Sequence, residues 1–194
     1  MARDGYHHGD LRSALLEAAR EIVAVQGPDA VSLRDLAKAL GVSPAAPYRH
    51  FPDRQSLLNE IAAQGFAQLG RDYANAAERA DPVDALRATG RAYLNLAFER
   101  PGLFQLMFES DLLGPGSPPA LLHQAAAAWQ ALHDAVARAN PGAELAEVKL
   151  RTITGWSVLQ GFVTIRRGGR LKAFMTAPLT EEELIEAILD KAQA

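Results

Sequence analysis

Apolar positions recur at helical spacing along almost the whole chain. From about residue 10 onward, leucine, isoleucine, valine, alanine and aromatic residues return every three or four positions, with charged and polar residues between them. This period predicts amphipathic helices. No segment alternates with the two-residue period of a half-buried strand. About nine helices are expected, over residues 10–26, 33–40, a short stretch after 43, 54–79, 82–100, 103–110, 119–139, 143–166 and 181–192.

Residues 32–51 predict two helices joined by a tight turn. Ser32 is placed to cap the first helix, with Asp35 as its partner in a capping box. Gly41 is expected to end that helix in a left-handed conformation. Ser43 can cap a second helix, and Pro44 fits its first position. Two helices across a short glycine-containing turn form a helix-turn-helix, whose second helix can enter a DNA major groove.

The second helix carries the chemistry expected of a DNA contact. Tyr48, Arg49 and His50 offer hydroxyl, guanidinium and imidazole donors to phosphate oxygens. Pro47 has no N–H to donate and should push Ala46 away from α geometry. The resulting helix is expected to be very short.

Base recognition by this helix is predicted to be modest. Ala45 and Ala46 have no hydrogen-bond donors, so direct readout would depend on Ser43, on Arg49 or on methyl contacts to thymine. Arg34 is a further candidate for a base or phosphate contact, and part of the specificity is expected to come from DNA shape.

The net charge of the chain does not by itself favour binding to nucleic acid. The net charge is −3, and the chain up to Arg54 carries seven basic and seven acidic residues. A positive face must therefore come from local placement. Its candidates are Arg12, Arg34, Lys38, Arg49, His50 and Arg54.

Composition and motifs reduce the number of protein classes to which the chain could belong. The absence of cysteine excludes disulfides and thiolate chemistry. With neither a signal-peptide pattern nor a membrane-length apolar run, a cytoplasmic protein without a membrane partner is expected. A helical enzyme is a weak alternative, because the sequence has no nucleophile with an adjacent base, no metal-spaced cluster and no glycine-rich phosphate loop. No metal or cofactor is expected.

The second part of the chain suggests a pocket and a self-interface. A set of large side chains there forms either plain core or the wall of an apolar effector pocket, in which the Gln160 amide and the Thr89 hydroxyl are expected to supply polarity. This set is Tyr93, Phe104, Met107, Phe108, Trp129, Trp156 and Gln160. The helix over 144–166 is apolar on more than one face, so with 181–192 it is expected to pack against its own copy across a two-fold axis.

Three stretches resemble one family. SLRDLAKALGVSPAAPYRHFPDRQSLL resembles the N-terminal signature of TetR-type (tetracycline-repressor-like) transcriptional regulators. ERPGLFQLMF at 99–108 and GWSVLQGF at 155–162 resemble the C-terminal domain of a subgroup with a Trp-His-Gly motif. Gln160 stands at the histidine position of this motif, so this chain has no imidazole there.

The resemblance implies an all-α homodimer that regulates transcription, most often as a repressor. Residues 1–52 would form the DNA-binding head, and 53–194 a larger domain that dimerises and encloses a small-molecule pocket. Effector binding would change the spacing of the two heads, with the helix from 54 as a lever, and release operator DNA. A repressor or activator controlled without a ligand, or by a partner, is the alternative. The family's DNA-contact positions correspond to Ser32, Arg34, Ser43, Ala45, Ala46, Tyr48, Arg49, His50 and Arg54, the last commonly lysine.

Overall fold

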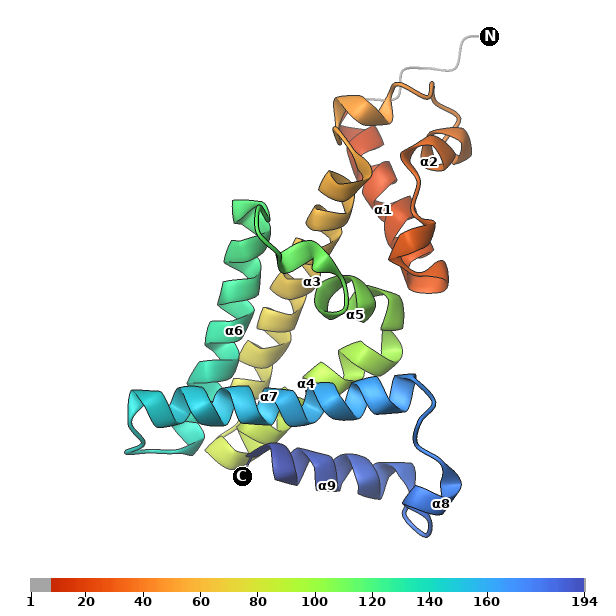
Figure 1. The fold of residues 1–194 in the computed structure, drawn as a ribbon. Coiled ribbons are helices and arrows are strands. Elements are labelled where there is room, and N and C mark those ends of the chain that lie inside the picture. The colour runs from red at the N-terminus through yellow and green to blue at the C-terminus, as the bar shows by residue number, and fades with distance from the viewer. Residues whose placement is uncertain (1–7, 194) are drawn as a thin grey trace. The chain divides into compact units, whose positions relative to one another are not determined.

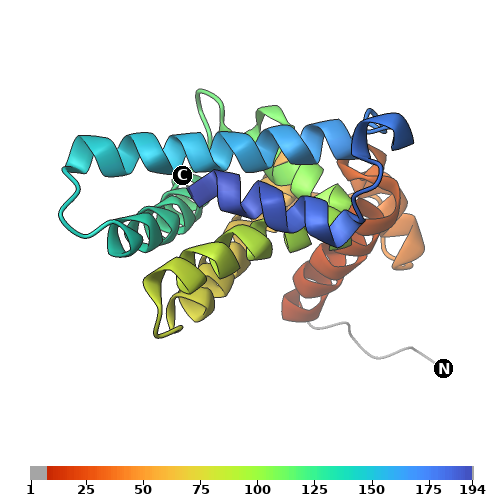
Figure 2. The same cartoon turned by 90° about the horizontal axis from the view of Figure 1, so that it is seen from below.

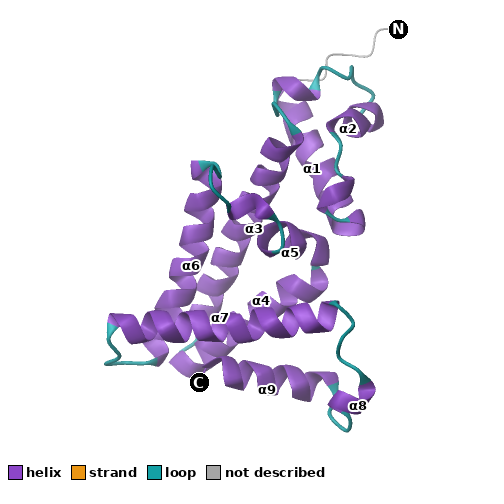
Figure 3. Cartoon of the chain, in the orientation of Figure 1, coloured by secondary structure: helices purple, strands orange, loops and turns teal. Residues whose placement is uncertain are grey.

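The computed structural model describes residues 8–193 and is built from helices and connecting loops (Figures 1 and 3). The expected N-terminal arm lies outside the described residues up to position 7, and the first helix begins two residues before the expected Asp10. In chain order the elements are α1 (His8–Gln26), η1 (Pro28–Ala30), α2 (Leu33–Ala39), η2 (Pro47–Arg49), α3 (Arg54–Ala77), α4 (Pro82–Glu99), α5 (Pro101–Phe108), η3 (Asp111–Leu113), α6 (Pro119–Ala139), α7 (Leu145–Arg167), α8 (Ala173–Thr176) and α9 (Glu181–Gln193).

These residues form two compact units. Unit 1 contains the described residues up to Phe66 together with Glu99–Gln124, and unit 2 contains Ala67–Phe98 and the chain from Ala125 onward. The chain therefore passes from one unit to the other inside α3, at the end of α4 and inside α6. The functional boundary expected after residue 52 stays a prediction.

The predicted Ser32 cap and the predicted Gly41 end of α2 are confirmed; of the two bonds of the expected capping box, the structure gives the one from the Asp35 N–H to Ser32. The Ser32 hydroxyl oxygen accepts a hydrogen bond from the Asp35 N–H at 3.3 Å. At the other end Gly41 has φ +67°, the left-handed conformation that glycine adopts without strain. The Val42 N–H donates to the Ala37 carbonyl at 3.0 Å, as in a Schellman motif. The turn after α2 is thus fixed by local hydrogen bonds.

The second helix is as short as expected, but it begins at Pro47 and not at Pro44, with Ala46 and not Ser43 at its N-cap. It is a single 3-10 turn, η2, and Ala46 before it has α geometry (φ −63°, ψ −43°), so the expected displacement of Ala46 is wrong. Pro47 explains why this helix is only a 3-10 turn. The first α-type bond to the Ser43 carbonyl would need the N–H that Pro47 lacks, and the Ala46 N–H donates to that carbonyl at 3.0 Å instead.

In unit 1, α5 approaches α1 closely. Gly102 is buried in the first turn of α5, and a Cβ atom built on it would overlap the carbonyl oxygen of Val23 on α1. The predicted cap of α3 is also present: the Ser56 N–H donates to the Asp53 carboxylate at 2.6 Å. Unit 1 therefore contains the helix-turn-helix, the first part of α3 and all of α5.

In unit 2, α7 and α9 lie side by side (Figures 1 and 2). The capping box predicted for α9 is confirmed, because the Thr180 N–H donates to the Glu183 carboxylate at 2.7 Å and the Glu183 N–H donates to the Thr180 hydroxyl at 3.2 Å. These bonds lower the pKa of Glu183. The one-turn helix α8 was not predicted from the sequence. None of the described helices is both long enough and apolar enough to cross a bilayer.

Candidate nucleic-acid interface and effector cavity

The structure presents the turn after α2 to solvent. Tyr48 and Arg49 are exposed on η2, and Tyr48 keeps 53% of its surface accessible although it is a large aromatic residue. Pro47 is buried beneath them and anchors the turn. The remaining predicted DNA contacts divide by exposure: Arg34, Ser43 and Ala45 are exposed, whereas Ser32, Ala46 and His50 are half-buried. The exposed set can offer a hydroxyl and a guanidinium to phosphate oxygens.

Arg54 has contacts within the protein. Its Nε donates to the Val31 carbonyl at 2.9 Å and one Nη donates to the Pro28 carbonyl at 2.6 Å. The same Nη lies 3.6 Å from the Asp29 carboxylate. The guanidinium therefore ties the start of α3 to the segment that leads into α2, and its predicted contact with DNA stays a prediction.

Replacing Arg54 with alanine is expected to lower the free energy of unfolding by about 1–3 kcal/mol, because two carbonyls lose charge-assisted hydrogen bonds. Arg71→Ala, at an exposed arginine of the same helix, is the matched control and should change stability little. Urea unfolding measures both. If Arg54 contributed only a DNA contact, operator binding would weaken while the unfolding curve stayed in place.

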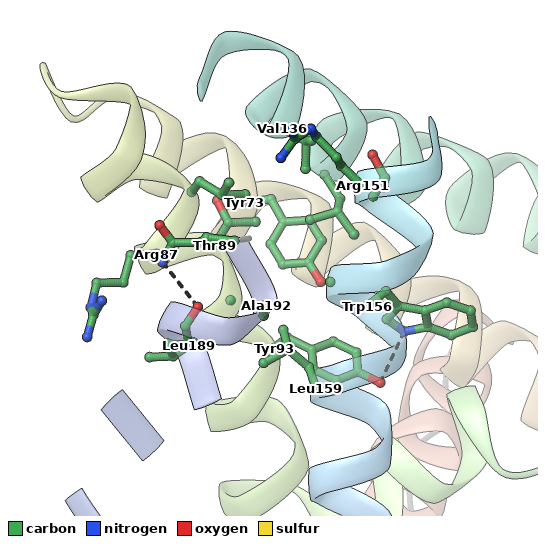
Figure 4. Close-up of a pocket in the computed structure, with 16 residues that line it drawn as sticks. Tyr73, Arg87, Thr89, Tyr93, Val136, Arg151, Trp156, Leu159, Leu189 and Ala192 are labelled. Atoms are coloured by element: carbon green, nitrogen blue, oxygen red, sulfur yellow. Dashed lines mark hydrogen bonds between the residues drawn. The ribbon is translucent and has the colours of Figure 1, made fainter. Parts of the chain in front are cut away.

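A small cavity lies inside unit 2 (Figure 4). It is enclosed by residues of α3, α4, α6, α7 and α9, among them Leu86, Leu132, Val136, Leu159 and Leu189. The volume open to the centre of a water molecule is only about 30 Å³. A mostly apolar lining with a few polar groups is typical of small-molecule sites, but this one is nearly closed.

Two of the seven predicted pocket residues line this cavity, and two more contact them from outside the lining. Tyr93 and Trp156 line it, and the Trp156 indole N–H donates to the Tyr93 hydroxyl at 3.3 Å (Figure 4). The Tyr93 hydroxyl in turn donates to the Gln160 amide oxygen. Trp129 packs edge-on against Trp156, with the ring centroids 6.3 Å apart. Gln160, at the position expected for histidine, thus supplies a hydrogen-bond acceptor to the cavity wall.

Sequence reasoning named Thr89 for the polar lining but missed Tyr73 and Thr152. Tyr73 of α3 lines the cavity, and burial, with smaller effects of Tyr93 and Asp72, raises its pKa, so the phenol stays protonated. Thr89 and Thr152 are fully buried and donate to the carbonyls of Ala85 and Val148 within their own helices. A buried threonine on an otherwise apolar helical face is a weak signal, because such internal bonds satisfy it anywhere in a core.

The other three predicted pocket residues belong to unit 1. Phe104 and Met107 are fully buried there, and Phe108 packs against Phe104 and Phe66 with ring centroids 5.0 and 5.4 Å away. None of them lines the cavity of unit 2. Their contact with an effector stays a prediction.

Unit 1 contains a second, wider hollow of about 360 Å³. Its lining includes Leu58 and Leu106 but also the charged side chains of Asp29, Arg54 and Asp111. Among the described residues no group of three His, Cys, Asp or Glu side chains is arranged to hold a metal ion. The cavity of unit 2 is the better candidate for an apolar effector, because its lining is mostly apolar.

A glycine-terminated helix, a tight turn and an exposed Tyr-Arg pair, backed by an all-helical body, define a helix-turn-helix DNA-binding protein. Comparison with known proteins agrees. The family profile described as "Bacterial regulatory proteins, tetR family" matches residues 15–61, and the one described as "Tetracyclin repressor-like, C-terminal domain" matches residues 86–192. The chain belongs to the TetR family of DNA-binding transcriptional regulators.

Relatives and solved structures share this fold. The chain is 29% identical over 97 residues to the uncharacterised HTH-type transcriptional regulator YobS of Bacillus subtilis (strain 168), covering 50% of this chain and 51% of YobS. It thus spans about half the length of the curated relatives it matches. A protein of unknown function from Rhodococcus sp. RHA1 superimposes with a TM-score of 0.80 at 29% identity, covering 98% and 97% of the two chains. The TetR-family regulator PfmR from Thermus thermophilus superimposes with a TM-score of 0.64 at 26% identity. The match covers 92% of this chain and 96% of PfmR.

Proposed function

We propose that the chain is a homodimeric repressor that binds double-stranded operator DNA and is released from it by a small, mostly apolar effector. The observation that carries the DNA-binding part is the exposed Tyr48–Arg49 turn on a family-typical head. A dimer presents two such turns to successive half-sites of a palindromic operator. The site of action is the cytoplasm, the compartment that holds a bacterial chromosome.

The experiment that tests this is recovery of genomic fragments on the purified protein, followed by binding to the recovered site across a salt series. A two-fold symmetric site, with affinity that falls as salt rises, is expected, because the exposed donors address phosphates. Failure to retain any fragment, by a protein that is folded and of defined oligomeric state, would contradict the proposal.

The apolar side chains on α7 and α9 support self-association. Leu150, Ile153 and Ile165 of α7 keep 65%, 49% and 41% of their surface exposed. On α9, Ala187 is exposed and Ile188 is half-buried. A run of exposed apolar residues on neighbouring helices is typical of a protein interface, and a two-fold axis lets one surface pair with its own copy.

Ile153→Glu is expected to shift the protein from dimer to monomer, because the change places two carboxylates in the paired surface without partners. Val83→Glu is the matched control: Val83 is an exposed apolar residue of α4, outside this surface, and keeps 54% of its area accessible. Sedimentation velocity measures both variants at equal concentration. The proposed interface is wrong if the two sediment alike.

The cavity of unit 2 supports the effector part of the proposal. An effector present at 100 times its Kd should stabilise the protein by about 2.7 kcal/mol in a thermal-shift screen of lipophilic compounds. To release DNA measurably it needs to bind the DNA-incompetent dimer more tightly by about 1–3 kcal/mol. The alternative, a regulator controlled without a ligand, is favoured if no compound changes either melting temperature or operator affinity.

A further inference from the structure

Exposed large apolar side chains are concentrated in one part of unit 2. Of the thirteen found among the described residues, seven lie on α7 or on the segment 168–180 that joins α7 to α9 and contains α8. We call this segment the connector. Phe174 on α8 is the most exposed of all, at 85%. An apolar surface of this extent is typical of a protein interface. The seven residues are Leu145, Leu150, Ile153, Ile165, Phe174, Met175 and Leu179.

One row of residues on α7 has a symmetric order of sizes. Ile153, Ser157, Gly161 and Ile165 follow one another at four-residue spacing, so they lie on the same side of the helix. The two isoleucines keep 49% and 41% of their surface exposed. The exposed Ser157 hydroxyl donates to the Ile153 carbonyl at 2.7 Å, so it presents no unpaired donor to a partner. The row therefore reads large, small, small, large from either end.

Gly161 is not required by packing inside the chain. A Cβ atom built on it would meet no atom within 4 Å, whereas one on Gly90, Gly102 or Gly155 would meet an atom at 2.8 Å or less. Glycine in a helix interior is unfavourable relative to alanine. A small residue on an exposed helical face lets a second helix approach closely, because the distance between helix axes depends on the side chains at the contact.

A two-fold axis perpendicular to α7 makes the two copies of this helix antiparallel. When the axis passes midway between Ser157 and Gly161, the small residues of both copies meet at the crossing. Ile153 then lies opposite the partner's Ile165, and the same contact is repeated on the other side of the axis. The order of sizes in the row thus matches its own reversed copy.

The charges beyond this row fit the same antiparallel order. Glu144, the N-cap residue of α7, is exposed and makes no side-chain cap bond. Arg170 and Lys172 are exposed on the connector, past the opposite end of α7 (Figure 1). Antiparallel pairing brings this basic segment of one copy to the start of α7 in the other. There Phe174 can cover Leu145 of the partner subunit, the residue that follows the acidic cap and is 61% exposed.

We propose that two copies of the chain cross antiparallel along α7 at Ser157 and Gly161, and that the connector of each copy docks on the start of the partner's α7. This alignment rests on the proposed homodimer and specifies which residues meet in it. The connector, which has few contacts within its own chain to explain Phe174, becomes part of the interface.

The first test uses cysteines, because the chain has none of its own. A protein that carries both Ile153→Cys and Ile165→Cys should be joined into a covalent dimer by a short bismaleimide, because each thiol faces the other kind of thiol in the partner. Either substitution alone places its two copies about 18 Å apart, twelve residues along the helix, and so does the pair within one chain. We expect the double variant to link about tenfold faster than either single variant, because its thiols are at a higher effective concentration.

Denaturing gel electrophoresis measures the linked fraction, and sedimentation velocity on the same samples gives the oligomeric state. A dimer in which a single variant links as fast as the double variant, or in which no variant links, overturns the alignment but leaves the homodimer standing. A parent protein that sediments as a monomer contradicts the proposed homodimer itself.

Gly161→Trp tests the crossing. The indole should raise the dissociation constant of the dimer about 100-fold, because it occupies the space between the two helices at the axis. Ala74→Trp, at an exposed alanine of α3 in unit 2, is the matched control and should dimerise as the parent does. Circular dichroism verifies that both variants keep their helices. Equal dissociation constants for the two variants would contradict a crossing at Gly161.

An exchange of charges tests the docking of the connector. Glu144→Lys and Lys172→Glu should each speed the exchange of subunits about tenfold, because each brings like charges together at two symmetry-related places. Combined, they restore opposite charges, and the rate should return to within about threefold of the parent. Native mass spectrometry of mixed isotope-labelled and unlabelled protein follows the exchange. The connector does not face the partner's Glu144 if neither single variant changes the rate, or if the double variant exchanges faster than both.

Discussion

Replacement of Gly102 by alanine is expected to lower the free energy of unfolding by about 3 kcal/mol. The added Cβ would overlap the Val23 carbonyl oxygen and lie 2.9 Å from its carbonyl carbon. Both atoms belong to the backbone of α1, so no side-chain rotation relieves the overlap, and α5 must move away from α1. That movement disturbs the packing of Phe104 and Met107, which follow Gly102 on α5 and are fully buried.

The direction of this stability change distinguishes a crowded glycine from an ordinary helical glycine. Alanine is a better helix former than glycine by about 1 kcal/mol, so the same substitution at an uncrowded helical position should stabilise the protein. Gly70 provides the control, because a Cβ there would meet nothing closer than 3.7 Å. Chemical denaturation of Gly70→Ala and Gly102→Ala should move the midpoint in opposite directions. If Gly102→Ala is as stable as the parent, the described contact of α5 with α1 is wrong.

Arg49→Ala is expected to weaken operator binding strongly. Loss of one well-placed guanidinium contact costs about 1–3 kcal/mol, and a dimer loses it at both half-sites, which corresponds to about 30-fold to more than 10,000-fold in affinity. Arg49 is exposed, so its replacement should leave the stability of the fold unchanged. Arg79→Ala, which removes an equal charge at an exposed position of unit 2, is the control and should bind almost as the parent does.

A salt series on the same variant separates two roles for Arg49. A phosphate contact predicts equal weakening on all sequences and a salt slope reduced by about one per contact. A base contact predicts that discrimination at one position is relaxed. Binding by Arg49→Ala that equals binding by Arg79→Ala would show that the η2 turn does not face DNA.

Local signals in the sequence predicted much of the fold. Gly41, Asp53 and Thr180 mark helix ends through hydrogen bonds within a few residues, which the chain makes whatever surrounds it. The Pro101–Gly102 pair marks the break between α4 and α5 for the same reason. That Gly102 also lets α5 approach α1 could not be predicted, because a contact between distant segments leaves no local pattern.

The candidate sites divide in the same way, into features set by the local sequence and features set by contacts between distant segments. Exposure of Tyr48 and Arg49 follows from the turn chemistry beside them. The pocket wall depends on which helices become neighbours, and apolar periodicity does not specify that. Phe104 and Tyr93 have the same signature in the sequence, yet only Tyr93 lines the cavity of unit 2. The very short η2 was predictable in outline from Pro47, but its α-type Ala46 depends on the surrounding packing.

The near absence of free space inside unit 2 has a kinetic consequence. If only a minor population of molecules is open at any moment, the apparent Kd of an effector is its intrinsic Kd divided by that population. The observed rate of association would then rise with effector concentration only up to a plateau, set by how often the cavity widens. After a sudden rise in effector concentration, the transcriptional response could then be no faster than this plateau rate. The tight packing inside unit 2 would thus limit the speed of the response.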